Sequence, residues 1–308
     1  MDRVERAAEV RYASAAELPD ALRGADALFV WDFLSTAVPD AWHAADRLRW
    51  LHIASAGVDP VMFDELRAGD VVLTNSRGVF DTPIAEYVLG AILALAKDLF
   101  HTRDLQREKR WVHRETARVA GTSAVVVGTG PIGRAIARLL RAAGIRVSGA
   151  GRRYREHDSD FGVVYPSDSL SEHVGGVDYV IAVAPLTEQT SRMFDRHVFR
   201  AMRNDAWFIN VGRGELAETS DLIEALDTGQ LRGAVLDVFD TEPLPASSPL
   251  WTMPNVLVSP HMSGDVVGWR DALVEIFTDN FARWVDGKPL RNVVDKELGY
   301  VPSETPSG

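Results

Sequence analysis

The chain has 308 residues and carries 44 acidic against 33 basic side chains, which gives a formal net charge of -11. This negative charge repels phosphate backbones and argues against a nucleic-acid-binding protein. The length, together with a hydrophobic content of 46%, fits two globular domains with substantial cores. The absence of cysteine excludes disulfides and thiolate chemistry and is compatible with a reducing cytoplasm.

The sequence contains no candidate membrane span. Its most apolar helical stretch, residues 87–96, is far shorter than the ~20 residues that a span requires. The N-terminus lacks the apolar core of a signal peptide. We therefore expect a cytoplasmic protein with no membrane partner, and its motifs predict no metal site.

The first ~95 residues alternate short apolar runs with turn residues and helical segments, at the rhythm of an α/β domain. Strands are predicted over residues 27–31, 50–53 and 71–74. A long helix is predicted to start near Pro83 and to continue toward Trp111, with apolar residues on more than one face. Burial at a domain junction or in a dimer interface would account for that pattern.

A second α/β series begins at Gly121. Six apolar runs separated by helical segments indicate a doubly wound parallel sheet. The predicted strands span residues 124–128, 147–149, 179–183, 207–211, 234–238 and 256–259. A further amphipathic helix is predicted over about residues 266–285.

A glycine-rich turn follows the strand at 124–128 and opens a helix. Gly128 permits a tight turn, Gly130 lets backbone N–H groups approach a pyrophosphate, and Gly133 allows close packing of the helix on the strand. The flanking strand and helix, with another strand at 147, indicate a dinucleotide-binding loop. Its six residues are Gly128, Thr129, Gly130, Pro131, Ile132 and Gly133.

The next strand ends without the acidic residue that NAD-binding domains usually place about 20 residues further on, to bind the ribose 2′-hydroxyl. The chain reads Gly151, Arg152 and Arg153 instead, and the first acid is Glu156. Two guanidinium groups can bind a 2′-phosphate that a carboxylate would repel. We therefore expect NADP(H) as the preferred cofactor. NAD(H) is the alternative if both arginines are merely solvated surface residues.

Three ionisable side chains follow three later strands at their carboxyl ends, where doubly wound sheets bind ligands. They are Arg213 between two glycines, Glu242 before a proline and His261 after a proline. An arginine can hold a carboxylate and polarise a carbonyl, and a histidine can move a proton. A neighbouring glutamate can stabilise the imidazolium. Singly, each could be a turn, capping or surface residue; together they suit reduction of a 2-oxo acid.

At these residues the chain resembles the D-isomer-specific 2-hydroxyacid dehydrogenase family, over nearly its whole length. Besides the glycine loop, the matching motifs span residues 184–187 with Thr190, 209–214, 237–239 with 242–243, and 260–261. The resemblance implies an α/β fold of two doubly wound parallel-sheet domains. A Rossmann dinucleotide-binding domain (residues 96–264) would be inserted into a flavodoxin-like substrate domain (residues 1–95 and 265–308).

The resemblance also implies the site. Arg213 would bind the substrate carboxylate and carbonyl, Glu242 would support the histidine and His261 would be the acid/base. Ala56 and Gly57 match a turn whose backbone amides hold the substrate carboxylate, and the helix with Glu86 implies a homodimer. Beyond the glycine loop and residues 151–153, the implied cofactor contacts are Ala184, Pro185, Thr190, Val211, Gly212, Asp237, His261, Ser263 and Gly264.

The expected function is NADP(H)-linked reduction of small 2-oxo acids, such as glyoxylate, hydroxypyruvate or bulkier 2-ketoacids, to D-2-hydroxy acids. Trp31 and Phe33 follow the first strand, and Trp269 follows His261. If these aromatic residues line the pocket rather than the core, bulky substrates would rival glyoxylate. Two alternatives stay open. One is NAD-dependent oxidation of D-2-hydroxy acids, and the other, of a different class, is a dinucleotide-sensing binding protein.

Overall fold

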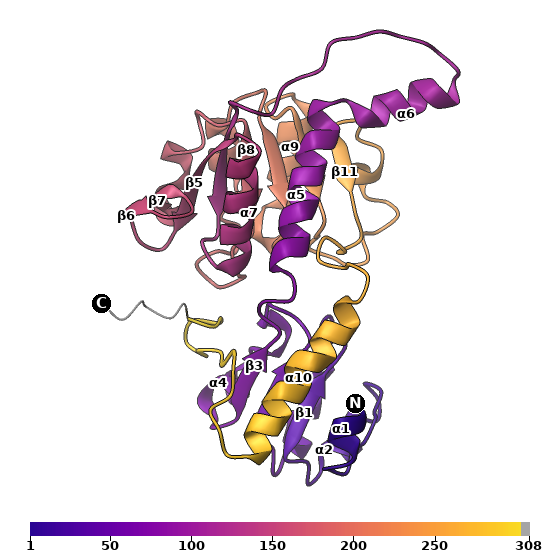
Figure 1. Ribbon diagram of the computed structural model, residues 1–308, viewed down its shortest axis with the longest axis vertical. Coiled ribbons are helices and arrows are strands. Elements are labelled where there is room, and N and C mark those ends of the chain that lie inside the picture. The colour runs from indigo at the N-terminus through magenta and orange to yellow at the C-terminus, as the bar shows by residue number, and fades with distance from the viewer. Residues whose placement is uncertain (303–308) are drawn as a thin grey trace. The chain divides into compact units, whose positions relative to one another are not determined.

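The computed structural model describes residues 1–302 and divides into two compact units (Figure 1). The first unit combines Met1–Phe80 with the chain from Val266 onward, and the second consists of Asp81–Asp265. Residues 303–308, which belong to the expected substrate domain, lie outside the described residues. Within residues 1–302, no helix combines the length and the apolar character needed to cross a membrane.

The first unit is built on a three-stranded parallel sheet in the order β1-β2-β3. Its strands agree with the three predicted ones: β1 (Ala27–Val30), β2 (Trp50–Ile53) and β3 (Val72–Asn75). All four residues of β2 are buried, as expected for a central parallel strand covered on both faces. The short helices of this unit are α1 (Asp2–Glu5), α2 (Leu18–Leu22), α3 (Ala37–Ala41), η1 (Trp42–Ala44), η2 (Asp59–Val61) and α4 (Asp64–Ala68).

Helix α10 (Trp269–Val285) crosses one face of this sheet (Figure 1). Its Phe277 stacks on Trp50 of β2, with ring centroids 5.3 Å apart, and on Phe29 of β1 at 4.2 Å. Side chains alternate along a strand, so Leu51 and Ile53 enter the core on the opposite face. The amphipathic helix predicted near residues 266–285 is therefore present, starting at Trp269.

The second unit contains an eight-stranded sheet in the order β11-β10-β9-β8-β4-β5-β7-β6. All neighbouring strands are parallel except β6, which pairs antiparallel with β7 at the edge. The six predicted strands are present as β4 (Ser123–Val127), β5 (Arg146–Gly151), β8 (Tyr179–Ala182), β9 (Trp207–Asn210), β10 (Gly233–Leu236) and β11 (Val256–Val258). The predicted α/β class with parallel sheets is thus confirmed.

Strand β4 lies between β5 and β8, so the chain leaves β4 to one side and later returns to the other. Open parallel sheets bind ligands at the carboxyl ends of the strands beside such a switch point. The hairpin of β6 (Arg155–Asp158) and β7 (Gly162–Pro166) was not predicted. Besides the two helices described in the next paragraphs, this unit contains the helices α7 (Pro131–Ala142), η3 (Ser167–Glu172), α8 (Arg196–Ala201), η4 (Gly214–Leu216), α9 (Thr219–Asp227) and η5 (Pro249–Trp251).

Helix α5 (Asp81–Ala96) belongs to the second unit, so the first segment ends at residue 80 rather than near the expected residue 95. The helix buries Ile84, Val88 and Ile92 and packs against α7. Figure 1 shows the two helices side by side over the same face of the sheet. Contact with α7 on one side explains why apolar residues occupy so much of the α5 surface.

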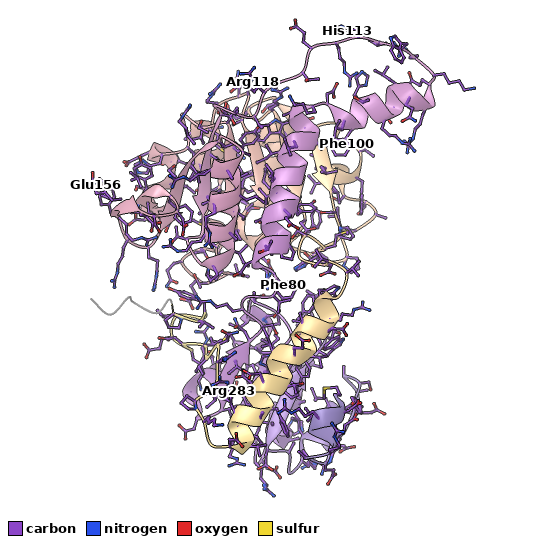
Figure 2. The ribbon with its side chains drawn as sticks, in the orientation of Figure 1. Phe80, Phe100, His113, Arg118, Glu156 and Arg283 are labelled. Atoms are coloured by element: carbon purple, nitrogen blue, oxygen red, sulfur yellow. The ribbon has the colours of Figure 1, made fainter. Side chains whose placement is uncertain are left out.

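The predicted single helix toward Trp111 is wrong. Asp98 adopts a left-handed backbone (φ 50°), and a separate helix, α6 (Leu99–Arg107), starts after it. Arg114 stabilises the break, because its Nε donates to the Asp98 carboxylate at 2.6 Å and its Nη2 to the Asp98 carbonyl at 2.9 Å. Helix α6 and the segment to Arg118 form an arm on which Phe100 and His113 are exposed (Figure 2).

Candidate active site at the carboxyl ends of the strands

The glycine loop joins β4 to α7 as predicted, and two of its glycines are required by close packing. Gly128 has a φ of 114°, and a Cβ there would lie 2.6 Å from the Ala184 backbone nitrogen. A Cβ on Gly133 would lie 1.9 Å from the Gly128 carbonyl oxygen. A Cβ on Gly130 would meet no atom within 4 Å. The space beside Gly130 is therefore open to a ligand.

The same loop presents backbone donors toward that space. Within the described residues, the N–H groups of Thr129 and Gly130 donate to no protein acceptor. The first N–H groups of α7 follow directly, and a helix N-terminus attracts anions. Open space, spare donors and a helix N-terminus fit the pyrophosphate of a dinucleotide.

The end of β5 is pressed against the glycine loop. A Cβ on Gly151 would lie 2.9 Å from the Thr129 hydroxyl oxygen, so glycine suits this position. Arg152 and Arg153 follow at once, and both are exposed. No carboxylate stands between Gly151 and Glu156, which leaves this end of β5 basic.

The predicted motif after β8, residues 184–187 with Thr190, forms a closed turn. The Thr190 hydroxyl donates to the Pro185 carbonyl at 2.7 Å and accepts from the Thr187 N–H at 2.8 Å. Thr190 therefore shapes the turn, while Ala184 packs at 7% exposure against the glycine loop. The structure explains this motif through its backbone geometry.

Arg213 lies in the loop after β9, where Asn210 holds the backbone. The Asn210 side chain donates to the Arg213 carbonyl at 2.8 Å and accepts from the Gly212 N–H at 3.1 Å. A Cβ on Gly214 would lie 1.9 Å from the carbonyl carbon of Phe239, in the loop after β10. This contact between the two loops brings Arg213 to the neighbourhood of Glu242.

Glu242 and His261 are hydrogen-bonded to each other. Glu242 Oε2 lies 2.7 Å from His261 Nδ1, and Glu242 Oε1 accepts from the Phe239 N–H at 2.9 Å. Burial would raise the pKa of the Glu242 carboxyl, but the hydrogen bond and charge of His261, the Phe239 N–H and the charge of Arg213 outweigh it. The pKa of Glu242 is therefore lowered, which keeps the carboxylate charged beside the imidazole.

Asp237 holds the loop that carries His261. It is fully buried, and its carboxylate accepts from the N–H groups of Met262 and Ser263 at 3.0 and 2.9 Å. Its carbonyl accepts from the His261 N–H at 2.8 Å. His261 itself adopts a left-handed backbone (φ 50°), a conformation that needs such support in a residue with a side chain. Asp237 therefore positions the loop.

Two residues of this network had no predicted role. The Ser259 hydroxyl donates to Asp237 at 2.5 Å and bonds the Tyr87 hydroxyl at 2.5 Å. Burial raises the pKa of the Tyr87 phenol. Tyr87 lies on α5, 172 residues before Ser259, so no local sequence pattern could connect the two. Position at the end of β11 was the only signal for Ser259.

The remaining predicted cofactor residues lie at the same edge of the sheet. Val211 is 5% exposed and Gly212 is half-buried, both directly after β9. Ser263 and Gly264 are buried beyond His261. The structure thus gathers the predicted catalytic residues and the predicted cofactor residues at the carboxyl ends of one sheet.

Apart from Arg213, the predicted substrate residues belong to the first unit. In the turn after β2, the Ala56 carbonyl accepts from the Asn75 side chain at 2.6 Å and the Gly57 carbonyl from the Ser55 hydroxyl at 2.5 Å. Within residues 1–302, the N–H groups of Ala56 and Gly57 donate to no protein acceptor. Trp31, just after β1, is 44% exposed.

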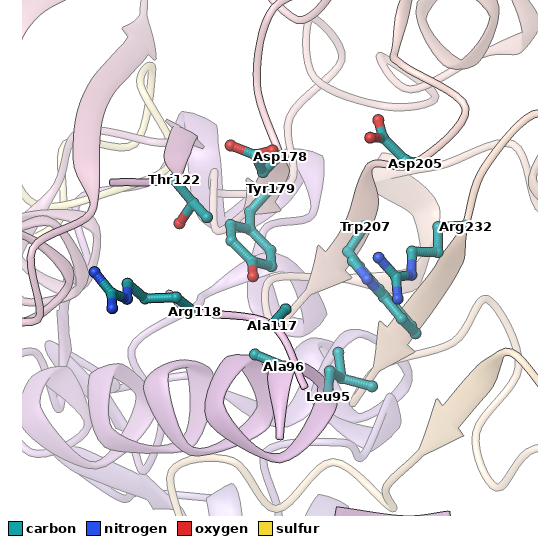
Figure 3. A pocket seen from close by; sticks show the side chains of 10 residues that line it. All are labelled: Leu95, Ala96, Ala117, Arg118, Thr122, Asp178, Tyr179, Asp205, Trp207 and Arg232. Carbon is teal, nitrogen blue, oxygen red and sulfur yellow. The ribbon is translucent and has the colours of Figure 1, made fainter. Parts of the chain in front are cut away.

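A cavity of about 120 Å³ lies at the opposite, amino edge of the second sheet (Figure 3). Tyr179 of β8 and Trp207 of β9 line it, with Leu95 of α5. The two carboxylates that line it, Asp178 and Asp205, both pair with Arg203. No predicted site residue lines this cavity. Within residues 1–302, no three His, Asp or Glu side chains are arranged to hold a metal ion.

Residues 89–263 match the family model described as D-isomer specific 2-hydroxyacid dehydrogenase, NAD binding domain. The chain belongs to this family. A glyoxylate reductase of Thermococcus kodakarensis is 29% identical over 269 residues, which cover 84% of this chain and 80% of that protein. These matches confirm the predicted family.

Solved structures agree over nearly the whole chain. A D-isomer specific 2-hydroxyacid dehydrogenase family protein from Aeromonas salmonicida is 33% identical with a TM-score of 0.82, covering 96% of this chain and 95% of that one. The NADPH-dependent glyoxylate/hydroxypyruvate reductase of Sinorhizobium meliloti, in complex with NADP and sulfate, is 31% identical with a TM-score of 0.81 and coverages of 93% and 90%. This member of the family is therefore an oxidoreductase that uses a nicotinamide dinucleotide and a small-molecule substrate.

Proposed function

We propose that the protein reduces small 2-oxo acids to D-2-hydroxy acids with NADPH, and that His261 donates the proton. The observation that carries this proposal is the 2.7 Å hydrogen bond between Glu242 Oε2 and His261 Nδ1. Because Glu242 engages Nδ1, proton transfer to the substrate falls to Nε2. When bound, the dinucleotide supplies the hydride.

Arg213, His261 and Glu242 have different roles in this reaction. Arg213 binds the substrate carboxylate and stabilises the charge that develops on the carbonyl oxygen. His261 gives its proton to that oxygen, and the Glu242 carboxylate stabilises the imidazolium before the transfer and fixes the tautomer after it. The N–H groups of Ala56 and Gly57 are further proposed donors to the carboxylate, supported by their lack of an acceptor within residues 1–302.

The choice of NADPH over NADH is part of the proposal. Arg152 and Arg153 stand exposed after β5, where NAD-binding domains usually place an acid. The Sinorhizobium meliloti relative, which contains NADP, supports the same choice. For the substrate, the 44% exposed Trp31 supports a pocket wall that also accepts bulky 2-oxo acids.

Turnover of the purified protein tests the proposal directly. Loss of NADPH absorbance and, in parallel, of NADH absorbance would be followed with 2-oxo acids from glyoxylate to phenylpyruvate. We expect turnover with NADPH well above that with NADH. Faster turnover with NADH, or D-2-hydroxy acid oxidation as the only activity, would favour the NAD-dependent alternative. Tight dinucleotide binding without turnover of any substrate would favour a sensing protein.

We also propose that the protein works as a homodimer. The arm after α5 exposes Phe100 at 47% (Figure 2), and further along it exposes Trp111 at 101% and Val112 at 44%. Such a row of exposed large apolar residues is typical of a surface covered by a partner. The mass measured by light scattering during gel filtration should be twice that of the chain, and Trp111→Ser should shift it toward the monomer. The absence of cysteine supports a cytoplasmic location, which is likewise a proposal.

A further inference from the structure

A buried carboxylate anchors the hairpin that follows Arg152 and Arg153. Asp158, at the end of β6, has a side chain that is only 5% exposed. Its two oxygens accept from Nη1 and Nη2 of Arg134, each at 3.0 Å, and from Nε of Arg155 at 3.0 Å. Two parallel bonds between a guanidinium and a carboxylate fix orientation as well as distance. Asp158 therefore holds two arginines in defined positions.

Asp158, Arg134 and Arg155 form an ionic cluster, and its charge state supports its rigidity. Burial would raise the pKa of the Asp158 carboxyl, but the hydrogen bonds from Arg134, the Asp160 N–H and Arg155 outweigh it and lower that pKa. The carboxylate is therefore charged throughout the neutral range, and both ion pairs persist. Arg134 also bonds Asp160 at 2.7 Å, which extends the cluster to the turn between β6 and β7.

The backbone turns Asp158 inward. His157 has a φ of 61°, and the register of β6 on β7 shifts between Glu156 and Asp158. Such a bulge re-aims the side chain that follows it. Glu156, before the bulge, is exposed at the outer end of the hairpin (Figure 2). The acid that follows the bulge is thus held by two arginines, whereas the one before it is solvated.

The cluster also connects the glycine loop with the end of β5, the two segments that are proposed to bind the cofactor. Arg134 lies in the first turn of α7, immediately after the glycine loop. Strand β6 pairs only with β7 at the edge of the sheet, and the Asp158 ion pairs fasten it to α7. Three residues, Arg152 to Tyr154, bridge the end of β5 and the start of β6. One end of this bridge is fixed by the β5 ladder and the other by Arg155.

We propose that Asp158 is a positioning residue that sets the choice of cofactor. Acting through Arg155 and Arg134, it holds the Arg152–Arg153 bridge where both guanidinium groups reach the 2′-phosphate of NADP(H). Three residues can span only a short distance, so the backbone of this bridge has few alternative conformations while both ends are held. Releasing the end at Arg155 therefore displaces the guanidinium groups of Arg152 and Arg153. This inference rests on the proposed preference for NADPH and adds the residue that preorganises it.

The test compares the two dinucleotides in the full-length enzyme. In Asp158→Asn we expect the KM for NADPH, and its Kd in a fluorescence titration without substrate, to rise about tenfold. Both constants for NADH should change less than about twofold, and kcat with saturating NADPH should persist. Asp221→Asn is the matched control, because it removes the partly buried carboxylate that pairs with Arg196 at α8. It should leave the ratio of the two KM values unchanged.

A double-mutant cycle separates positioning from a general structural effect. In the Arg152→Ala, Arg153→Ala background, Asp158→Asn should not change the NADPH-to-NADH ratio further. An equal, additive effect in both backgrounds would overturn the proposal. If Asp158→Asn does not fold, Arg155→Gln releases the same end of the bridge and leaves the Arg134–Asp158 pair in place.

The same measurements separate this inference from the proposed function. A wild-type enzyme with no preference for NADPH overturns the proposed cofactor choice and this inference with it. A wild-type enzyme that prefers NADPH, beside an Asp158→Asn variant with the same preference, overturns only the role of Asp158. A lost preference in Asp158→Asn and a retained one in Asp221→Asn support both.

Discussion

Two histidines, one within a parallel strand and one in the loop after another, have opposite surroundings. His52 of β2 is fully buried in the first unit, beside the stacked rings of Phe29 and Phe277, and bonds the Thr74 hydroxyl at 2.8 Å. His261 follows β11 in the second unit, is 23% exposed and bonds the Glu242 carboxylate at 2.7 Å. Burial keeps His52 neutral, whereas His261 has a carboxylate as its hydrogen-bond partner. The surroundings, rather than the residue type, separate a core histidine from a proposed acid/base.

The largest effect is expected at His261. In His261→Gln, kcat for 2-oxo acid reduction should fall about a thousandfold, because the proton donor is lost. NADPH binding should change by less than about twofold, since the residue acts on the carbonyl oxygen. Steady-state kinetics and a fluorescence titration with NADPH measure the two quantities. Near-normal turnover would mean that another group delivers the proton.

The direction of the reaction sharpens this test. Reduction needs a protonated His261 and oxidation needs a neutral one, so the two directions should lose activity at opposite ends of the pH range. The pH profiles of kcat/KM in both directions measure this difference. Identical profiles would exclude His261 as the acid/base.

A smaller effect, on stability, is expected at His52. Burial lowers the pKa of His52 from 6.5 to about 3. The unfolded chain therefore binds a proton between these values while the folded chain does not. Stability is complete above pH 6.5 and falls as the pH drops toward 3, by on the order of 2 kcal/mol between pH 7 and pH 5.

Urea unfolding at several pH values measures this loss. His52→Gln should unfold more easily at neutral pH and should flatten the dependence between pH 7 and pH 5. The same slope in the variant and in the wild type would assign the loss to other groups. His261→Gln provides the matched control, because that side chain is partly exposed and lies in the other unit.

The smallest of the three effects is expected at Glu242. In Glu242→Gln the amide still accepts from the Phe239 N–H but no longer carries the charge that stabilises the imidazolium. We expect kcat for reduction to fall about tenfold, and the alkaline limb of its pH profile to move to lower pH. A lower kcat with an unmoved limb would indicate that Glu242 only orients the ring.

Local patterns predicted most strands, because the strands of a parallel sheet are short apolar runs bounded by turn residues. All six expected strands of the second unit are present, and so are the three of the first. The β6–β7 hairpin escaped prediction because β6 reads Arg-Glu-His-Asp, without an apolar face. Its pairing depends on β7 and on the contact of Asp158 with α7, which no local pattern records.

The helix after Pro83 shows a second limit of local reading. Apolar residues continue past Ala96, and nothing in that spacing reveals the left-handed Asp98. Arg114, 16 residues away, stabilises the break. The boundary near residue 95 was an implication of the family resemblance. The first segment ends at Phe80 because α5 packs against α7 of the second unit.

The sequence by itself determined the class of fold and the family, and it pointed to the residues that are proposed to carry the chemistry, because glycine spacing and strand-end positions are local properties. Only the tertiary structure decided how these groups are held. Three contacts join segments that are distant in the sequence. Gly214 packs so closely on Phe239 that a Cβ would lie 1.9 Å from it, Asp237 binds the loop of His261, and Asp158 pairs with Arg134. Such contacts arise when strands assemble into one sheet, and the energy that orients a side chain comes from them.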